Sequence, residues 1–323
     1  MILWLAAAVL AVAFAVYLLA LNARTYTQRT HARFPPTGRF IEADGVRLHV
    51  RETEPPVGAA APILLIHGAS SNLLELWGPL ADEFSPLHRV IAYDRPGMGY
   101  SARAKNGAHT MKSQAAAAAR VLESTIDGPA LVVAHSLGAG VALRLALDHP
   151  QLVSGLVLIA PACNPYPWKP AWWARLAATP IIGDIFCGLV VPWLGPPMSA
   201  GGVASNFWPA PVPANYRDEA GVPLIFRPRA FRASAIDVCA SSAEFGAQQP
   251  RYAELLTPTI ILTAEKDKIV SPKRHARALA ADLPAAELVI APDTGHMPHR
   301  LRPDLVIAAI RRVNEMTSAP VEG

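Results

Sequence analysis

Six short, continuous apolar runs constrain the fold more than any other feature of this chain. Each run has five or six residues, and helical stretches separate most of them. Strands that are apolar on both faces and alternate with helices indicate a mostly parallel sheet with helices on both faces. The sequence therefore predicts an α/β fold. The runs are Pro62–Ile66, Arg89–Tyr93, Ala130–Ala134, Gly155–Ala160, Thr259–Thr263 and Glu287–Ala291.

A hairpin is predicted before these runs, which brings the sheet to about eight strands. Arg39–Ala43 and Val46–Arg51 flank Asp44-Gly45, a pair that favours the positive φ angles of a two-residue turn. Helices are expected between the strands. Their predicted ranges are Leu73–Phe84, Met111–Ile126, Gly138–Asp148, Lys273–Leu283 and Pro303–Met316.

The N-terminal segment is apolar and carries no charged side chain from Met1 to Leu21. A helix of this length spans roughly 30 Å, the thickness of a bilayer core. Residues 1–21 are therefore predicted to form a transmembrane helix. A cleaved secretory signal is the alternative, although the run lacks a basic start and offers only a poor cleavage site. Residues 22–37, which include Pro35-Pro36, are predicted to be an irregular linker.

The charge pattern bears on location and partners. Arg24, Arg29 and Arg33 follow the apolar run and no basic residue precedes it, so the positive-inside rule keeps the following domain in the cytoplasm. A periplasmic or secreted domain is the alternative. The net charge of +4 is small for 323 residues and the basic residues are scattered. We therefore expect no nucleic-acid partner.

One stretch interrupts the alternation of strands and helices. Residues 163–252 are rich in proline and contain five of the seven tryptophans. They are predicted to form a helical cap inserted into a core of residues 38–162 and 253–318. The cap leaves and re-enters the sheet at the carboxyl ends of the strands, where open α/β sheets place their ligands.

The most informative string for chemistry runs from Leu131 to Gly140. An apolar strand leads into Ser136, which small residues flank, and then into a helix. This is the strand-turn-helix context of a nucleophilic serine, although Ala134 replaces the first glycine of the G-x-S-x-G pattern. The alternative is that Ser136 merely caps the helix that follows.

A serine nucleophile needs a base and an orienting acid. Asp267 follows one predicted strand and His296 follows the last one, on the same sheet edge as Ser136. The order Ser, Asp, His is that expected for this architecture. Glu265 and Asp293 are alternatives for the acid, and His299 is the alternative for the base.

Acyl transfer also needs two donors for the developing oxyanion. The amide of Leu137, the residue after the nucleophile, is one candidate. The amide of Ala69, in the small turn after the strand ending at Ile66, is the other. His67 begins this turn and is expected to form structural hydrogen bonds. Three widely spaced cysteines, without a nearby histidine cluster, indicate neither a zinc site nor a disulfide framework.

From about residue 39 to 316 the chain resembles the α/β-hydrolase superfamily. The resemblance rests on His67-Gly68, on the loop Asp94 to Ser101, on His135-Ser136-Leu137-Gly138, on Asp267 and on Gly295-His296. It implies Ser136 as nucleophile, His296 as base, Asp267 as acid, and the amides of Ala69 and Leu137 as the oxyanion hole. It assigns the Asp94 loop a structural role.

These features predict a serine hydrolase that cleaves hydrophobic or lipid-like carboxylic esters without a metal or organic cofactor. Epoxide hydrolases and haloalkane dehalogenases share the fold but have aspartate where Ser136 stands. Serine-dependent cleavage of lactones, amides or carbon–carbon bonds, or chemistry with peroxide, stays open because fold does not determine function. An inactive membrane-anchored binding protein is the alternative from another class.

Overall fold

The computed structural model describes residues 1–104 and 106–318. Its centre is one sheet of eight strands in the order β1-β2-β4-β3-β5-β6-β7-β8. The hairpin β1-β2 is antiparallel, β2 pairs antiparallel with β4, and all other neighbours are parallel. The strands are β1 (Arg39–Ala43), β2 (Val46–Glu52), β3 (Ala60–Ile66), β4 (His88–Tyr93), β5 (Ala130–His135), β6 (Val153–Ile159), β7 (Thr259–Ala264) and β8 (Ala286–Ala291).

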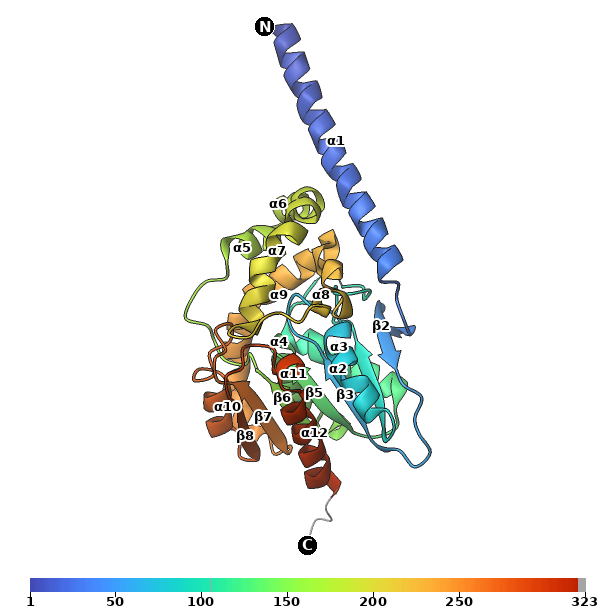
Figure 1. The fold of residues 1–323 in the computed structure, drawn as a ribbon, viewed down its shortest axis with the longest axis vertical. Coiled ribbons are helices and arrows are strands. Elements are labelled where there is room, and N and C mark those ends of the chain that lie inside the picture. The colour runs from blue at the N-terminus through green and yellow to red at the C-terminus, as the bar shows by residue number, and fades with distance from the viewer. Residues whose placement is uncertain (105, 319–323) are drawn as a thin grey trace.

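Helices cover both faces of this sheet (Figure 1). Helices α3, α4 and α10 share one apolar core with the sheet, and α2 and α12 share the other. The α/β prediction is thereby confirmed, since strands that are buried on both sides carry continuous apolar runs. The core helices are α2 (Leu74–Phe84), α3 (Met111–Thr125), α4 (Leu137–Asp148), α10 (Ala276–Asp282), α11 (Pro298–Leu301) and α12 (Pro303–Ser318), with a 3-10 turn η1 (Pro150–Leu152).

Helix α10 is shorter than predicted. The sequence predicts a helix over 273–283, but α10 begins at Ala276. The residues before it turn so that Nδ1 of buried His275 accepts hydrogen bonds from the amides of Cys163 (3.2 Å) and Asn164 (3.1 Å). A tertiary contact therefore overrides the local helical preference.

The segment between β6 and β7 is helical and lies over one end of the sheet (Figure 1). Its longest helix, α9, packs against α3 and α4 of the core as well as against the other cap helices. The cap elements are α5 (Trp172–Ala178), α6 (Ile182–Ile185), the π-helical turn η2 (Phe186–Val190), α7 (Val191–Phe207), α8 (Tyr216–Glu219), η3 (Val222–Phe226), α9 (Pro228–Gln248) and η4 (Gln249–Glu254).

The N-terminal helix α1 runs without interruption from Ile2 to Arg33. Within the described residues it is the one unbroken helix that is long and apolar enough to cross a membrane. The predicted irregular linker over residues 22–37 is wrong for residues 22–33, which continue the helix. Figure 1 shows α1 projecting well beyond the body of the molecule.

Packing against the cap explains why the helix continues. Ala23 and Thr30 are buried on it, and the hydroxyl of Tyr26 donates to the carbonyl of Pro223 (2.8 Å). Residues 22–33 contain neither glycine nor proline, so no residue interrupts the helical hydrogen bonds. Pro35 and its neighbour, which lack a backbone N–H, follow the last turn.

Candidate active site

The local fold exposes Ser136 in a sharp turn between β5 and α4. Ser136 has φ 54° and ψ −122°, a strained backbone for a residue with a side chain. Its amide donates to the carbonyl of Ile159 (2.9 Å), and its carbonyl accepts from the amide of Ala162 (3.0 Å). These bonds to the end of β6 hold the turn in its strained conformation.

Two glycines are required by the close approach of the chain at this turn. A Cβ on Gly138 would lie 2.5 Å from the carbonyl oxygen of Ile66 and 2.6 Å from that of His67. A Cβ on Gly68 would lie 3.0 Å from the Cβ of Ser136. The turn after β3 therefore packs directly against the start of α4. Ala134 is fully buried in the core, where its small side chain fits.

The structure brings Ser136, Asp267 and His296 together. Oδ2 of Asp267 accepts a hydrogen bond from Nδ1 of His296 (2.7 Å). Because Nδ1 carries the proton, Nε2 is free to accept from the hydroxyl of Ser136 at 3.0 Å. The other carboxylate oxygen, Oδ1, accepts from the amides of Ile269 (2.8 Å) and Val270 (2.9 Å). This geometry suits transfer of the serine proton to the imidazole.

The alternative acid and base residues lie elsewhere. Glu265 and Asp293 are exposed, and Glu265 accepts from the amide of Asp293 (3.3 Å). His299 is fully buried and its Nε2 donates to Glu75 (3.0 Å). Ser136, by contrast, contacts His296 directly, which favours the predicted triad over its rivals.

The predicted oxyanion donors come from two segments: Leu137 directly follows Ser136, and Ala69 lies in the turn after β3. The amide of Leu137 is at the first position of α4, where helix N–H groups lack an internal partner. Among the described residues, neither Leu137 nor Ala69 uses its amide in a hydrogen bond. The amide of the next residue, Ser70, is already bound to Oγ of Ser234 (2.8 Å). Ala69 and Leu137 therefore retain amides that are free to bind an oxyanion.

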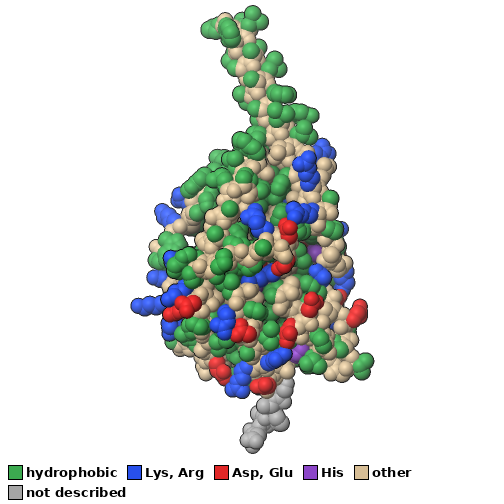
Figure 2. Space-filling model, viewed as in Figure 1, with side chains coloured by type: hydrophobic (Ala, Val, Ile, Leu, Met, Phe, Trp, Pro, Cys, Tyr) green, Lys and Arg blue, Asp and Glu red, His purple; other side chains and the backbone are tan. Residues whose placement is uncertain are grey.

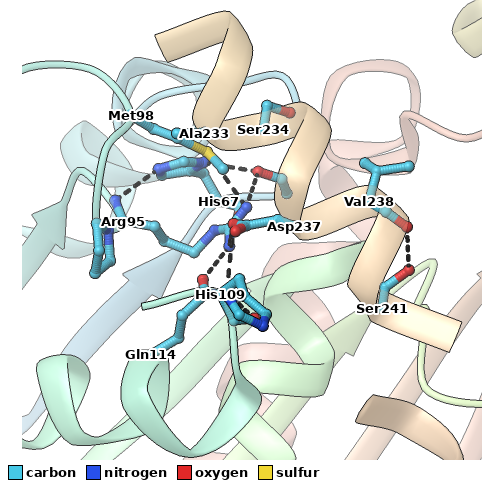
Figure 3. Close-up of polar contacts among 12 residues, drawn as sticks. His67, Arg95, Met98, His109, Gln114, Ala233, Ser234, Asp237, Val238 and Ser241 are labelled. Atoms are coloured by element: carbon cyan, nitrogen blue, oxygen red, sulfur yellow. Dashed lines mark hydrogen bonds and ion pairs between the residues drawn. The ribbon is translucent and has the colours of Figure 1, made fainter. Parts of the chain in front are cut away.

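A buried arginine, which the sequence analysis missed, holds the turn that carries Ala69. Arg95 is fully buried; its Nε donates to the carbonyl of His67 (3.0 Å) and its Nη2 to that of Gly68 (2.9 Å). Its Nη1 donates to Oδ2 of Asp237 on α9 (3.1 Å), as Figure 3 shows. This guanidinium joins the turn to the cap.

The same region contains a buried, neutral histidine. Nε2 of His67 accepts from the amide of Arg95 (3.0 Å), and its Nδ1 donates to the carbonyl of Gly68 (2.9 Å). Burial, together with the charge of Arg95, lowers the pKa of His67 to about 3. The ring thus has the structural role that its position after β3 predicts.

A second buried carboxylate, also missed, supports the loop of His296. Glu75 of α2 accepts hydrogen bonds from His299, from Nε of Arg300 (3.0 Å) and from the hydroxyl of Tyr216 (2.8 Å). Burial would raise the pKa of Glu75, but its hydrogen bonds and the neighbouring positive charges lower it to about 2. Because Tyr216 belongs to the cap, Glu75 connects α2, α11 and the cap.

His135, beside the nucleophile, also supports the base. Its Nε2 donates to the carbonyl of His296 (2.9 Å), and its ring lies 4.5 Å from that of His299. Burial and the neighbouring histidines hold the pKa of His135 well below its usual value. Within the described residues, no group of three or more His, Cys, Asp or Glu side chains is placed to hold a metal ion.

Comparison with known proteins agrees with this fold and arrangement. Residues 63–309 match the model of the Alpha/beta hydrolase family. A match of this length covers most of the chain, and the protein therefore belongs to the α/β-hydrolase family.

One curated relative matches the chain over part of its length. The chain is 33% identical over 135 residues to 2-hydroxymuconate semialdehyde hydrolase of Pseudomonas sp. (strain CF600), a match that spans 41% of this chain and 46% of the relative. It therefore spans about half the length of that relative.

Solved structures resemble the fold more completely. A thermophilic esterase from Thermogutta terrifontis has a TM-score of 0.64 at 22% identity, covering 87% of this chain and 100% of the esterase. The enol-lactonase from Burkholderia xenovorans LB400 has a TM-score of 0.66 at 19% identity, covering 85% and 99%. At these identities the likeness shows the fold alone.

Proposed function

We propose that this hydrolase is a serine enzyme that cleaves carboxylic esters through an acyl-enzyme intermediate. One observation carries the proposal: the hydrogen-bonded chain from Ser136 through His296 to Asp267. All three side chains are less than a tenth exposed, so water does not compete strongly for these hydrogen bonds.

In the first half-reaction, Oγ of Ser136 attacks the ester carbonyl carbon while Nε2 of His296 takes its proton. Asp267 stays ionised and stabilises the imidazolium. The amides of Ala69 and Leu137 stabilise the negative charge on the former carbonyl oxygen, a contribution of about 10²–10³ in rate per donor. The intermediate then collapses, and the departing alcohol takes the proton from His296.

In the second half-reaction, His296 removes a proton from water as the water attacks the acyl carbon. Collapse of the second intermediate releases the carboxylic acid and returns the proton to Ser136. All steps use side chains and amides of this chain together with water.

The proposed substrates are esters with a hydrophobic acyl or alcohol group. Trp208 of the cap supports this choice, because its ring lies over Lys268, next to the proposed acid, and aromatic side chains provide large apolar contact areas. Lactone hydrolysis is a second candidate, since a lactone is a cyclic ester and one structure of the same fold is an enol-lactonase.

We further propose that α1 anchors the enzyme as a single-pass membrane protein. Its length and apolar composition support this role. The three arginines that follow the apolar run, Arg24, Arg29 and Arg33, favour a catalytic domain on the cytoplasmic side.

Hydrolysis of p-nitrophenyl esters of increasing acyl chain length tests the proposed reaction. Wild type is expected to hydrolyse them with a preference for longer acyl chains, and Ser136→Ala is expected to lose this activity. Equal rates above background in the two proteins would exclude Ser136 as the nucleophile, and background rates in both would favour the inactive binding protein.

A further inference from the structure

One part of the cap surface is almost free of charge. Residues 176–216 contain a single charged side chain, Asp184, and its carboxylate is paired with Arg232 (2.5 Å). Six large apolar side chains on this surface are each more than half exposed. We call these residues the cap face: Trp172, Ile181, Ile182, Ile185, Trp193 and Met198.

This cap face lies beside the N-terminal helix. α1 packs against η2 and α7, and its contacts with the body begin near Leu19, whereas residues 1–18 are all exposed. Figure 1 shows α6 next to α1, below its free end, and Figure 2 shows apolar side chains continuing from α1 onto the cap. If residues 1–21 cross the bilayer, the cap face lies at the level of the membrane surface.

We propose that the cap face rests in the interface of the bilayer that α1 crosses, as a second membrane contact. This inference rests on the proposed role of α1 as an anchor. An exposed cluster of this kind is unusual on a soluble surface, and tryptophan is enriched at membrane interfaces. Apolar residues with few charges favour lipid over an acidic or basic protein partner.

The position of α7 links this contact to the active site. α7 begins at Val191 near the cap face, and Trp208 follows its last residue. A Cβ on Gly295 would lie 2.1 Å from the carbonyl oxygen of Trp208, and Nζ of Lys268 lies 3.2 Å from the centre of its ring. Gly295 and Lys268 adjoin the proposed base and acid, so the end of α7 lies beside the active site. With the cap face on the bilayer, we expect esters dissolved in the bilayer to be the substrates.

Tryptophan quenching tests the contact in the full-length protein. In a Trp4→Phe background, phosphatidylcholine vesicles brominated near the top of the acyl chain should quench fluorescence from Trp172 and Trp193. Replacing both by Phe should remove most of this quenching, whereas Trp77→Phe on α2 should leave it unchanged. Equal quenching in all three proteins would overturn the proposal.

An activity comparison provides the second readout. Ile182→Asp should lower hydrolysis of a long-chain p-nitrophenyl ester embedded in vesicles severalfold and leave p-nitrophenyl acetate hydrolysis unchanged. The matched control is Leu87→Asp, which changes an exposed apolar residue outside the cap and should affect neither rate. Unchanged hydrolysis of the embedded ester by I182D would contradict the proposal.

The two proposals fail in different ways. If wild type hydrolyses neither ester while Trp172 and Trp193 are quenched, the hydrolase proposal fails and the membrane contact stands. If the cap face instead joins two copies of the chain, quenching is absent and sedimentation in detergent shows a dimer that Ile182→Asp dissociates. That result would overturn the membrane contact.

Discussion

The catalytic edge of the sheet and the cap above it keep their shape by different means. At the sheet edge, backbone segments approach so closely that Gly138 has no room for a Cβ, and each member of the proposed triad lies in a turn that follows a parallel strand. The cap is instead joined to this edge by buried ion pairs, of which Arg95–Asp237 is the most enclosed, while its outer face is exposed and apolar. Chemistry and substrate access are thus separable by mutation.

The largest expected effect is on the chemistry at the sheet edge. His296→Ala removes the proposed base and should lower kcat about 10⁴–10⁶-fold while the protein stays folded. Steady-state kinetics with a p-nitrophenyl ester measure this loss. His299→Gln is the control: His299 donates to Glu75 rather than to Ser136, so its kcat should stay within about tenfold of wild type. A larger loss in H299Q than in H296A would favour His299 as the base.

The next effect concerns the attachment of the cap. Asp237→Ala leaves the buried guanidinium of Arg95 without its carboxylate and should reduce the free energy of unfolding by about 3–5 kcal/mol. Asp184→Ala breaks the more exposed pair with Arg232 on the same cap and should cost less than about 1 kcal/mol. Guanidinium titrations of both variants measure the difference. Equal losses would show that burial does not distinguish the two pairs.

Replacing glycine by alanine should change the stability of the protein in opposite directions in the two regions. Gly138→Ala forces a Cβ against two backbone carbonyls and should destabilise the protein by about 1–3 kcal/mol. Gly201→Ala on α7, where a Cβ meets no atom within 4 Å, should stabilise the helix by about 0.5–1 kcal/mol. Thermal unfolding of both variants tests this, and a loss in both would mean that the cap helix is as closely packed as the sheet edge.

The last effect is the pH dependence that buried His67 gives the sheet edge. The pKa of His67 is about 3 in the folded protein, below the roughly 6.5 of an unfolded chain. The unfolded state therefore binds the proton first. Above about pH 6.5, neutral His67 makes its full contribution to the free energy of unfolding. This contribution falls by about 1.4 kcal/mol for each pH unit below that value. Between pH 6.5 and 5, the free energy of unfolding should fall less steeply with pH in His67→Gln than in wild type. An identical slope in the two proteins would contradict this assignment.

The sheet and the order of the proposed catalytic residues along the chain were predictable because both depend on local patterns. Continuous apolar runs mark parallel strands, and Ser136, Asp267 and His296 lie in the turns that follow three of them. Chain direction then places them at one edge of the sheet. The small residues after β3 likewise indicate the amide of Ala69 as an oxyanion donor, which stays a prediction.

Contacts between distant segments were not predictable from a single sequence. Arg95 and Asp237 are separated by 142 residues, and Glu75 and His299 by 224. No local spacing connects the members of such pairs. The linker prediction was wrong for residues 22–33 for the same reason, because the cap surface that stabilises this part of α1 lies far along the chain.

Labelling with a fluorophosphonate probe tests the central claim most directly, because the probe forms a stable bond only with an activated serine. Mass spectrometry of the full-length protein should show a single adduct on the peptide that contains Ser136, and Ser136→Ala should show none. No adduct on wild type, or an adduct that persists in Ser136→Ala, would contradict the assignment of Ser136 as the nucleophile.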